Sequence, residues 1–250
     1  MNGGRDSGAR ANGLVEKELN LSLALKVRAE LERLGVEVVM SREGDVDVPL
    51  SARIEQACRA GVAGFLSIHH NSASNSEARG SETFYQADKE DSRSLASLVQ
   101  KALVRSTGLN DRGIKTRLRG DGQDYYYILR AAPMAAAICE VGFVTSRSDA
   151  ARLGTPAFKE MAAAGLASAL REFVGQGGAG PFLDVPANHW AVQEVNWVAR
   201  KRLMNGYPDG LFHGDDPVTR YQLAVALYRL SGEQMVDAQK ECEAEKKAKS

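Results

Sequence analysis

Residues 17–68 alternate between helix-like and strand-like apolar patterns, and this alternation limits the possible folds more than any other feature of the chain. Residues 17–34 carry apolar side chains at three- and four-residue steps and end at a glycine, which predicts an amphipathic helix: Leu19, Leu23, Val27, Leu31, Leu34 and Gly35. Residues 36–40 and 62–68 predict buried strands, with a helix at 50–61 between them. The order indicates an α/β fold, a mostly parallel twisted sheet flanked by helices.

The following residues continue the same pattern. Residues 92–106 predict a helix with its apolar side chains on one face, and three further segments predict strands: 80–87, 125–129 and 135–139. A closing helix is expected to begin at Thr155 and Pro156, an N-cap residue followed by a first-turn proline. We expect this first domain to span residues 1–174.

The remainder of the chain has a different composition. Residues 175–181 read as a Gly-rich linker. Residues 182–230 hold two short helical patterns around a Gly-Tyr-Pro-Asp-Gly turn, which predicts a small C-terminal helical module. Residues 231–250 are charged and carry few large apolar groups, so we expect a charged tail or a solvated helix there.

The charge balance and the apolar segments exclude several classes of partner. Lys and Arg number 32, as do Asp and Glu, so no net field draws the chain to nucleic acid or to an anionic membrane. No apolar run is long enough to span a membrane, and the N-terminus lacks the features of a signal peptide. A binding partner must therefore be recognised by a local group of residues and not by the net charge of the chain.

Three side chains suited to metal chemistry are placed where predicted strands end or a predicted helix begins. Glu16 precedes the first helix, His69 follows the strand at 62–68, and Glu140 follows the strand at 135–139. In open α/β sheets, ligands bind at the carboxyl ends of strands, and imidazole and carboxylate groups are normal donors to catalytic zinc. Taken singly, however, a histidine after a strand is more often structural, and a glutamate before a helix often serves the helix dipole.

Six ordered motifs decide between these readings: NGGRDSGA (2–9), GLVEKELNL (13–21), SREGDVDVPLSARIEQA (41–57), FLSIHHNS (65–72), RGIK (112–115) and ICEVGFVTSRSD (138–149). In order and approximate spacing the first domain resembles the zinc-dependent N-acetylmuramoyl-L-alanine amidases of the amidase-3 type. These enzymes cleave the amide bond between N-acetylmuramic acid and the L-alanine of the peptidoglycan stem peptide. The resemblance covers residues 2 to 174.

The resemblance implies a role for each of the three side chains. It implies that Glu16 and His69 are zinc ligands and that Glu140 is the catalytic carboxylate. Zn²⁺ is the implied cofactor and peptidoglycan the implied substrate. His70 stands where the family usually has a small residue, and we expect it to neighbour the site.

The chain departs from the family at the first zinc ligand, where Asn2 replaces a histidine. An amide is a poor zinc ligand beside imidazole. Three explanations stand open: a start codon assigned too far downstream, which would also remove a signal peptide and the family's first strand; a degenerate homologue that binds peptidoglycan or the cell wall without cutting it; and a fragment with weak activity that recruits another group such as His70.

The C-terminal module resembles one S-layer homology repeat over residues 182–230, on the residues Phe182, Asp184, His189, Trp190, Gly206, Tyr207, Asp209, Gly210, Phe212, Thr219 and Arg220. Such repeats anchor exported proteins to cell-wall polymers. The resemblance implies that Thr219 and Arg220 approach an anionic cell-wall polysaccharide, and the planar guanidinium of Arg220 can hold a carboxylate at two points.

The sequence thus predicts a peptidoglycan hydrolase of the cell envelope, tethered by a single wall-binding module. Two alternatives remain: a non-catalytic wall-binding protein that needs no metal, and a scaffold in which only the C-terminal module matters.

Overall fold

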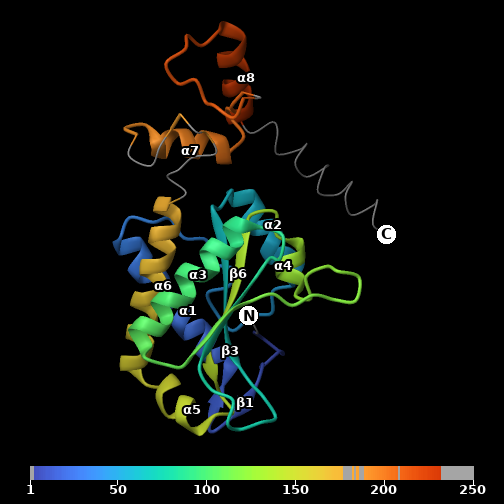
Figure 1. Cartoon of the computed structure of the whole chain (residues 1–250), viewed down its shortest axis with the longest axis vertical. Coiled ribbons are helices and arrows are strands. Elements are labelled where there is room, and N and C mark those ends of the chain that lie inside the picture. The colour runs from blue at the N-terminus through green and yellow to red at the C-terminus, as the bar shows by residue number, and fades with distance from the viewer. Residues whose placement is uncertain (1–2, 177–181, 183, 186–188, 208, 232–250) are drawn as a thin grey trace. The chain divides into compact units, whose positions relative to one another are not determined.

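The structure, a computed structural model, describes residues 3–176, 182, 184–185, 189–207 and 209–231. Residues 1–174 and residues 175–250 form two compact units. The fourteen helices and strands within the described residues appear in Figure 1. Their bounds are β1 (Arg10–Ala11), β2 (Leu14–Val15), α1 (Glu16–Arg33), α2 (Leu50–Ala60), β3 (Gly64–Asn71), β4 (Ser81–Tyr85), α3 (Glu90–Thr107), β5 (Asp111–Lys115), α4 (Tyr127–Ala131), β6 (Ala135–Phe143), α5 (Arg147–Leu153), α6 (Pro156–Gln176), α7 (Val192–Arg200) and α8 (Arg220–Leu230).

A four-stranded sheet in the order β3-β6-β4-β5 organises the first unit. β3 pairs with β6 and β4 pairs with β5 in parallel, whereas β4 and β6 are antiparallel. The predicted α/β class and the mostly parallel sheet are therefore confirmed, with one antiparallel pairing at the centre.

Helices cover both faces of this sheet, as Figure 1 shows. On one face, α1, α3 and α6 pack against alternate residues of β6, including Cys139 and Val141. On the other face, α2 and α4 pack against Phe65 of β3 and Ile138 of β6. Successive residues of a strand point to opposite faces of the sheet. Only every second residue of each strand can therefore reach the face that α2 and α4 cover.

Two predicted strands are wrong. Residues 36–40 form no strand, although Val36, Val38 and Met40 pack against the core; alternate burial alone does not make a strand, which also needs a hydrogen-bonded partner. In residues 125–129 the helix α4 begins at Tyr127, and its adjacent residues Ile128 and Leu129 are both buried against α2 and the sheet. This packing outweighs the strand propensity of aromatic side chains.

The second unit has a small core of its own, built around Phe182, Val185, Val192 and Val195. Asp184 links the start of this unit to residues 212 and 213. Its carboxylate accepts hydrogen bonds from the backbone N–H groups of Phe212 (2.8 Å) and His213 (2.7 Å). The predicted tail at 231–250 lies outside the described residues apart from Ser231, and the predicted linker at 175–181 lies outside them apart from Gly175 and Gln176.

Candidate catalytic and metal site

Three acidic or imidazole side chains form a row across the sheet. In the strand register His69 of β3 lies opposite Glu140 of β6, and Glu82 of β4 also lies opposite Glu140. Residues opposite each other in neighbouring strands point to the same face, which here is the face that α2 and α4 cover. The sheet thus brings His69 and Glu140 together, as the sequence predicted, and adds Glu82.

Glu16 reaches this row from the first residue of α1. Its Oε1 atom lies 2.9 Å from Nδ1 of His69, and its Oε2 atom accepts a 2.9 Å hydrogen bond from the backbone N–H of Ala9. Burial would raise the pKa of Glu16, but its hydrogen bonds with His69, Ala9 and Asn20 outweigh burial and lower the pKa to about 2. Burial lowers the pKa of His69. Glu16 is therefore ionised and His69 neutral near pH 7, the states in which both can donate to a metal.

Glu140 is the most perturbed carboxyl group in the site. Burial, together with the negative charges of Glu16 and Glu82, raises its pKa to about 8. Its Oε2 atom is buried and accepts no hydrogen bond from the described residues. A buried carboxyl oxygen without a hydrogen-bond partner is costly, so this geometry suits a site that admits a cation, a water molecule or a polar group of a substrate.

The carboxylate of Glu16 and the imidazole of His69 suit a zinc ion in their chemistry. Two donors that each lie about 2.1 Å from one tetrahedral zinc ion are roughly 3.4 Å apart. The 2.9 Å between Oε1 of Glu16 and Nδ1 of His69 is a hydrogen-bond distance, so the two atoms must move apart by about 0.5 Å to hold one zinc ion. No group of three His, Cys, Asp or Glu side chains that could hold a metal occurs within the described ranges, and Asn2, the predicted degenerate position, lies outside them.

The loop that follows Asn2 is held against the start of α1. Lys17 Nζ donates to the carbonyl oxygen of Gly4 (2.9 Å) and to Asp45 (2.6 Å), and the other oxygen of Asp45 accepts from the N–H of Gly4 (2.8 Å). Both glycines are required here, because a Cβ on Gly3 would lie 2.4 Å from the Val46 carbonyl oxygen and Gly4 has φ +57°. The roles of Lys17 and Asp45 were not predicted.

Glu82 is a second residue that the sequence analysis missed. Its Oε2 atom accepts 2.6 Å hydrogen bonds from Arg112 and Lys115, and its Oε1 atom accepts from Asn71 at 2.8 Å. Burial would raise the pKa of Glu82, but the two cations outweigh it, so the pKa lies below its usual value. A carboxylate within the otherwise uncharged strand SETFY was the available signal.

His70 points away from this row. It faces the α1 side of the sheet, where its Nδ1 atom lies 2.7 Å from Oδ1 of Asn20, and burial lowers its pKa to about 3. His70 adjoins His69 in sequence, but the strand directs the two rings to opposite faces.

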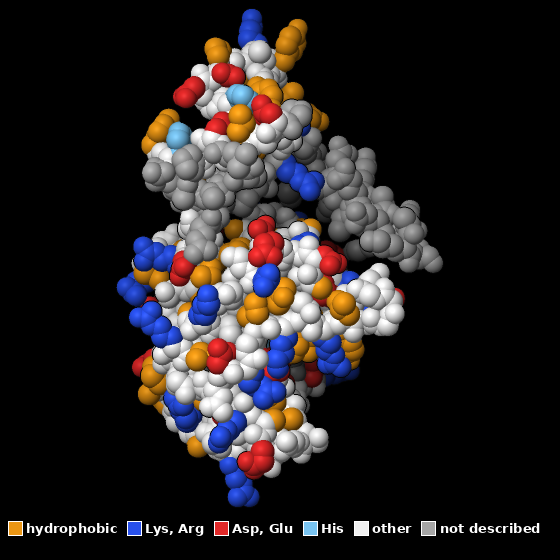
Figure 2. Space-filling view, viewed as in Figure 1, with side chains coloured by type: hydrophobic (Ala, Val, Ile, Leu, Met, Phe, Trp, Pro, Cys, Tyr) orange, Lys and Arg blue, Asp and Glu red, His pale blue; other side chains and the backbone are white. Residues whose placement is uncertain are grey.

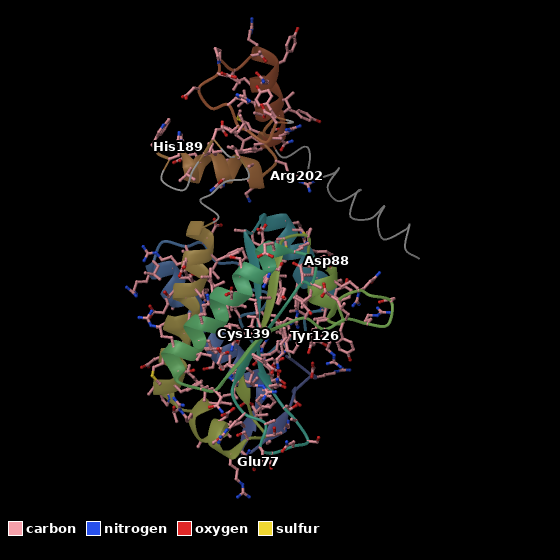
Figure 3. The ribbon with its side chains drawn as sticks, in the orientation of Figure 1. Glu77, Asp88, Tyr126, Cys139, His189 and Arg202 are labelled. Atoms are coloured by element: carbon pink, nitrogen blue, oxygen red, sulfur yellow. The ribbon has the colours of Figure 1, made fainter. Side chains whose placement is uncertain are left out.

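A groove adjoins the site on the face of α2 and α4. It has a volume of about 360 Å³, and its lining includes Asp6, Asp47, Arg53, His69, Tyr126 and Tyr127. Figure 3 marks Tyr126, which precedes α4, and Cys139 on β6. His69 lines the groove, so a chain bound there lies beside the residue that faces Glu140 across the strand pair.

Thr219 has a structural role in the second unit. Its hydroxyl accepts a hydrogen bond from the N–H of Gln222 (3.2 Å), and the side chain of Gln222 accepts one from the N–H of Thr219 (2.8 Å). This reciprocal pair is a capping box at the start of α8. Arg220 is exposed beside it.

Comparison with known proteins identifies the first unit. The model of the amidase-3 family, described as N-acetylmuramoyl-L-alanine amidase, matches residues 2–172. The chain belongs to this amidase family. LytC, an N-acetylmuramoyl-L-alanine amidase of Bacillus subtilis, is 37% identical over 163 residues, which are 64% of this chain and 32% of LytC. The chain therefore spans about a third of the length of that relative.

A solved structure shares the fold of the amidase unit, residues 1–174. It is the catalytic domain of CwlV, an N-acetylmuramoyl-L-alanine amidase from Bacillus (Paenibacillus) polymyxa, with a TM-score of 0.63 and 32% identity over 69% of this chain and 93% of that domain. The predicted family resemblance is thus confirmed.

The second unit has its own relatives. The S-layer homology model matches residues 181–224. The outer membrane protein SlpA of Thermus thermophilus is 49% identical over 53 residues, which are 21% of this chain and 6% of SlpA. The predicted S-layer homology repeat is confirmed, and the two family matches together point to the cell envelope. Within the described part of the chain, no helix has the length and apolar character to cross a membrane.

Proposed function

We propose that this chain hydrolyses the amide bond between N-acetylmuramic acid and L-alanine in peptidoglycan. The observation that carries the proposal is the row in which Glu140, with one buried oxygen lacking a hydrogen bond, lies opposite His69, itself 2.9 Å from Glu16. Membership of the amidase family supports the same reaction.

Glu16 and His69 would hold a Zn²⁺ ion. When bound, zinc polarises a carbonyl group and brings the pKa of a coordinated water toward about 7. Glu140 accepts the proton of the attacking water and then delivers it to the leaving nitrogen, which cannot depart as an anion. Its raised pKa suits a group that must both accept and release this proton. The reaction needs no covalent intermediate with the protein.

The second unit supplies attachment to the cell wall in this proposal. Arg220 is exposed and can pair with a carboxylate of an anionic wall polysaccharide, while Thr219 holds the start of α8 beside it. The protein would then act in the wall or periplasm, where its substrate lies.

One sequence feature favours a second candidate, a non-catalytic wall-binding protein: Asn2 stands where the family has its first zinc-binding histidine. Zinc content and the release of stem peptides from purified sacculi distinguish the two candidates. Near-stoichiometric zinc with peptide release supports the amidase. The non-catalytic binding protein is supported instead if the chain binds sacculi without zinc and without release of stem peptides. Circular dichroism must show that this chain is folded.

A further inference from the structure

A short hairpin projects from the amidase unit beside the groove. It spans residues 117–125 and is visible as the lime-green loop at the right of Figure 1. The backbone N–H of Tyr125 donates to the carbonyl of Arg117 (2.7 Å), and that of Arg119 donates to the carbonyl of Gln123 (2.8 Å). Gly122 has φ +80°, which the tight turn requires. The hairpin is thus an ordered element.

Aromatic rings link the hairpin to the sheet. Phe84 of β4 is buried and lies 5.1 Å from Tyr126 between ring centroids, and Tyr126 in turn lies 5.3 Å from Tyr125 in an edge-to-face contact. Tyr126 lines the groove, whereas Tyr125 is 48% exposed beyond it. The contacts hold an exposed ring in one place, so little conformational entropy is lost when a ligand stacks on it.

A guanidinium group accompanies the exposed ring. The Cζ atom of Arg117 lies 3.8 Å from the ring centroid of Tyr125 and 5.9 Å from that of Tyr126. Lys115 lies just before the hairpin, at the end of β5, where it binds Glu82. Figure 2 shows blue basic side chains gathered next to orange ones beside the projecting loop. The catalytic row is therefore bordered by cationic and aromatic groups.

We propose that Tyr125 and Arg117 form a second substrate contact, outside the groove, for the peptidoglycan polymer. The ring of Tyr125 stacks on the C–H face of a sugar of the glycan strand, and Arg117 pairs with a carboxylate of a stem peptide. This inference rests on the proposed function. It makes the enzyme select polymeric peptidoglycan over the minimal muramoyl peptide, which fills only the groove.

The test compares kcat/KM of the full chain on purified sacculi with kcat/KM on a soluble N-acetylmuramoyl dipeptide. In Tyr125→Ala the ratio of the two values should fall at least fivefold, whereas Tyr125→Phe, which keeps the ring, should stay within twofold of the unchanged chain. Arg119→Gln is the matched control, because Arg119 lies on the same hairpin and pairs with Asp121 at 3.2 Å. An unchanged ratio in Tyr125→Ala, or an equal loss in the phenylalanine variant, overturns the proposal.

A binding measurement keeps this inference separate from the proposed function. If the unchanged chain cleaves neither substrate, the amidase proposal fails, but sedimentation with sacculi stripped of secondary wall polymers still tests the hairpin. Tyr125→Ala should then weaken binding at least fivefold relative to Arg119→Gln. Equal binding of the two variants would refute the contact.

Discussion

Oε1 of Glu16 and Nδ1 of His69 lie 2.9 Å apart, although 53 residues separate them in the chain. Glu16 is the first residue of α1, and His69 lies near the end of β3. The backbone of Glu16 also donates to the carbonyl of Ala9 at 3.0 Å, which fixes the start of the helix. The helix α1 and the strand β3 thus each contribute one side chain to the pair of potential metal ligands.

Removal of either donor should abolish metal binding. In His69→Ala or Glu16→Ala the remaining side chain cannot hold a zinc ion by itself, so zinc content should fall from near-stoichiometric to background. Elemental analysis of the purified variants after dialysis measures this. The matched control is His70→Gln, because His70 faces the other side of the sheet and binds Asn20. Zinc retained in both alanine variants would contradict the donor assignment.

Glu140→Gln should keep zinc and lose hydrolysis. The amide has nearly the shape of the carboxylic acid but cannot accept the proton of water, and general acid–base catalysis contributes about 10²–10⁴-fold to rate. We expect kcat for stem-peptide release to fall by that factor while zinc content is unchanged. A variant with full activity would show that another group is the base.

Asn2→His should strengthen zinc binding. An imidazole at this position supplies the strong third ligand that the family uses, so affinity should rise by at least about tenfold. Competition with a chelating dye measures the dissociation constant. Equal affinity in both chains would mean that residue 2 does not reach the metal.

His70 should make the amidase unit less stable as the pH falls. Its pKa is about 3 in the folded protein against the usual 6.5, so above about pH 6.5 the ring is neutral in both states and contributes no pH dependence. Between these values the unfolded chain binds a proton that the folded chain excludes, and stability decreases by at most about 1.4 kcal/mol per pH unit.

The measurement is the guanidinium unfolding midpoint at several pH values, followed by far-UV circular dichroism. His70→Gln cannot titrate, so its midpoint should fall less steeply below about pH 6.5 than that of the unchanged chain. If the unfolding midpoints of the two proteins fall equally steeply with pH, His70 is not the cause of the loss of stability.

Substitutions of Thr219 and Arg220 should have different effects: the first on the stability of the second unit and the second on binding to the cell wall. Thr219→Ala removes a capping box and should destabilise the second unit by about 1 kcal/mol, whereas Thr219→Ser should retain most of that stability. Both tryptophans, Trp190 and Trp197, lie in this unit, so their fluorescence reports its unfolding. Arg220→Gln should leave the unfolding midpoint unchanged and weaken binding of the full chain to cell walls. Unchanged wall binding would contradict the role proposed for Arg220.

The apolar patterns predicted the helices well because those helices bury one continuous stripe. Leu19, Leu23, Val27 and Leu31 are all buried in the main core, as their spacing indicated. The six motifs likewise indicated the family and the class of chemistry, because the reaction requires particular residue types at particular places in the chain. The helix at 127–131 escaped prediction, since its two buried residues are adjacent and show no period.

The row of His69, Glu140 and Glu82 depended on contacts between distant segments. Glu82 reaches Glu140 only because β4 runs antiparallel beside β6, and no local pattern specifies which strands become neighbours. The clamp of Lys17 and Asp45 on Gly4 likewise joins segments that are distant in the chain. The opposite directions of His69 and His70 follow from strand alternation, but packing decides which other groups share a face with each ring. Local side-chain period selects helix or strand, but strand pairing and register arise when the whole core packs, and they decide which charged groups share a face.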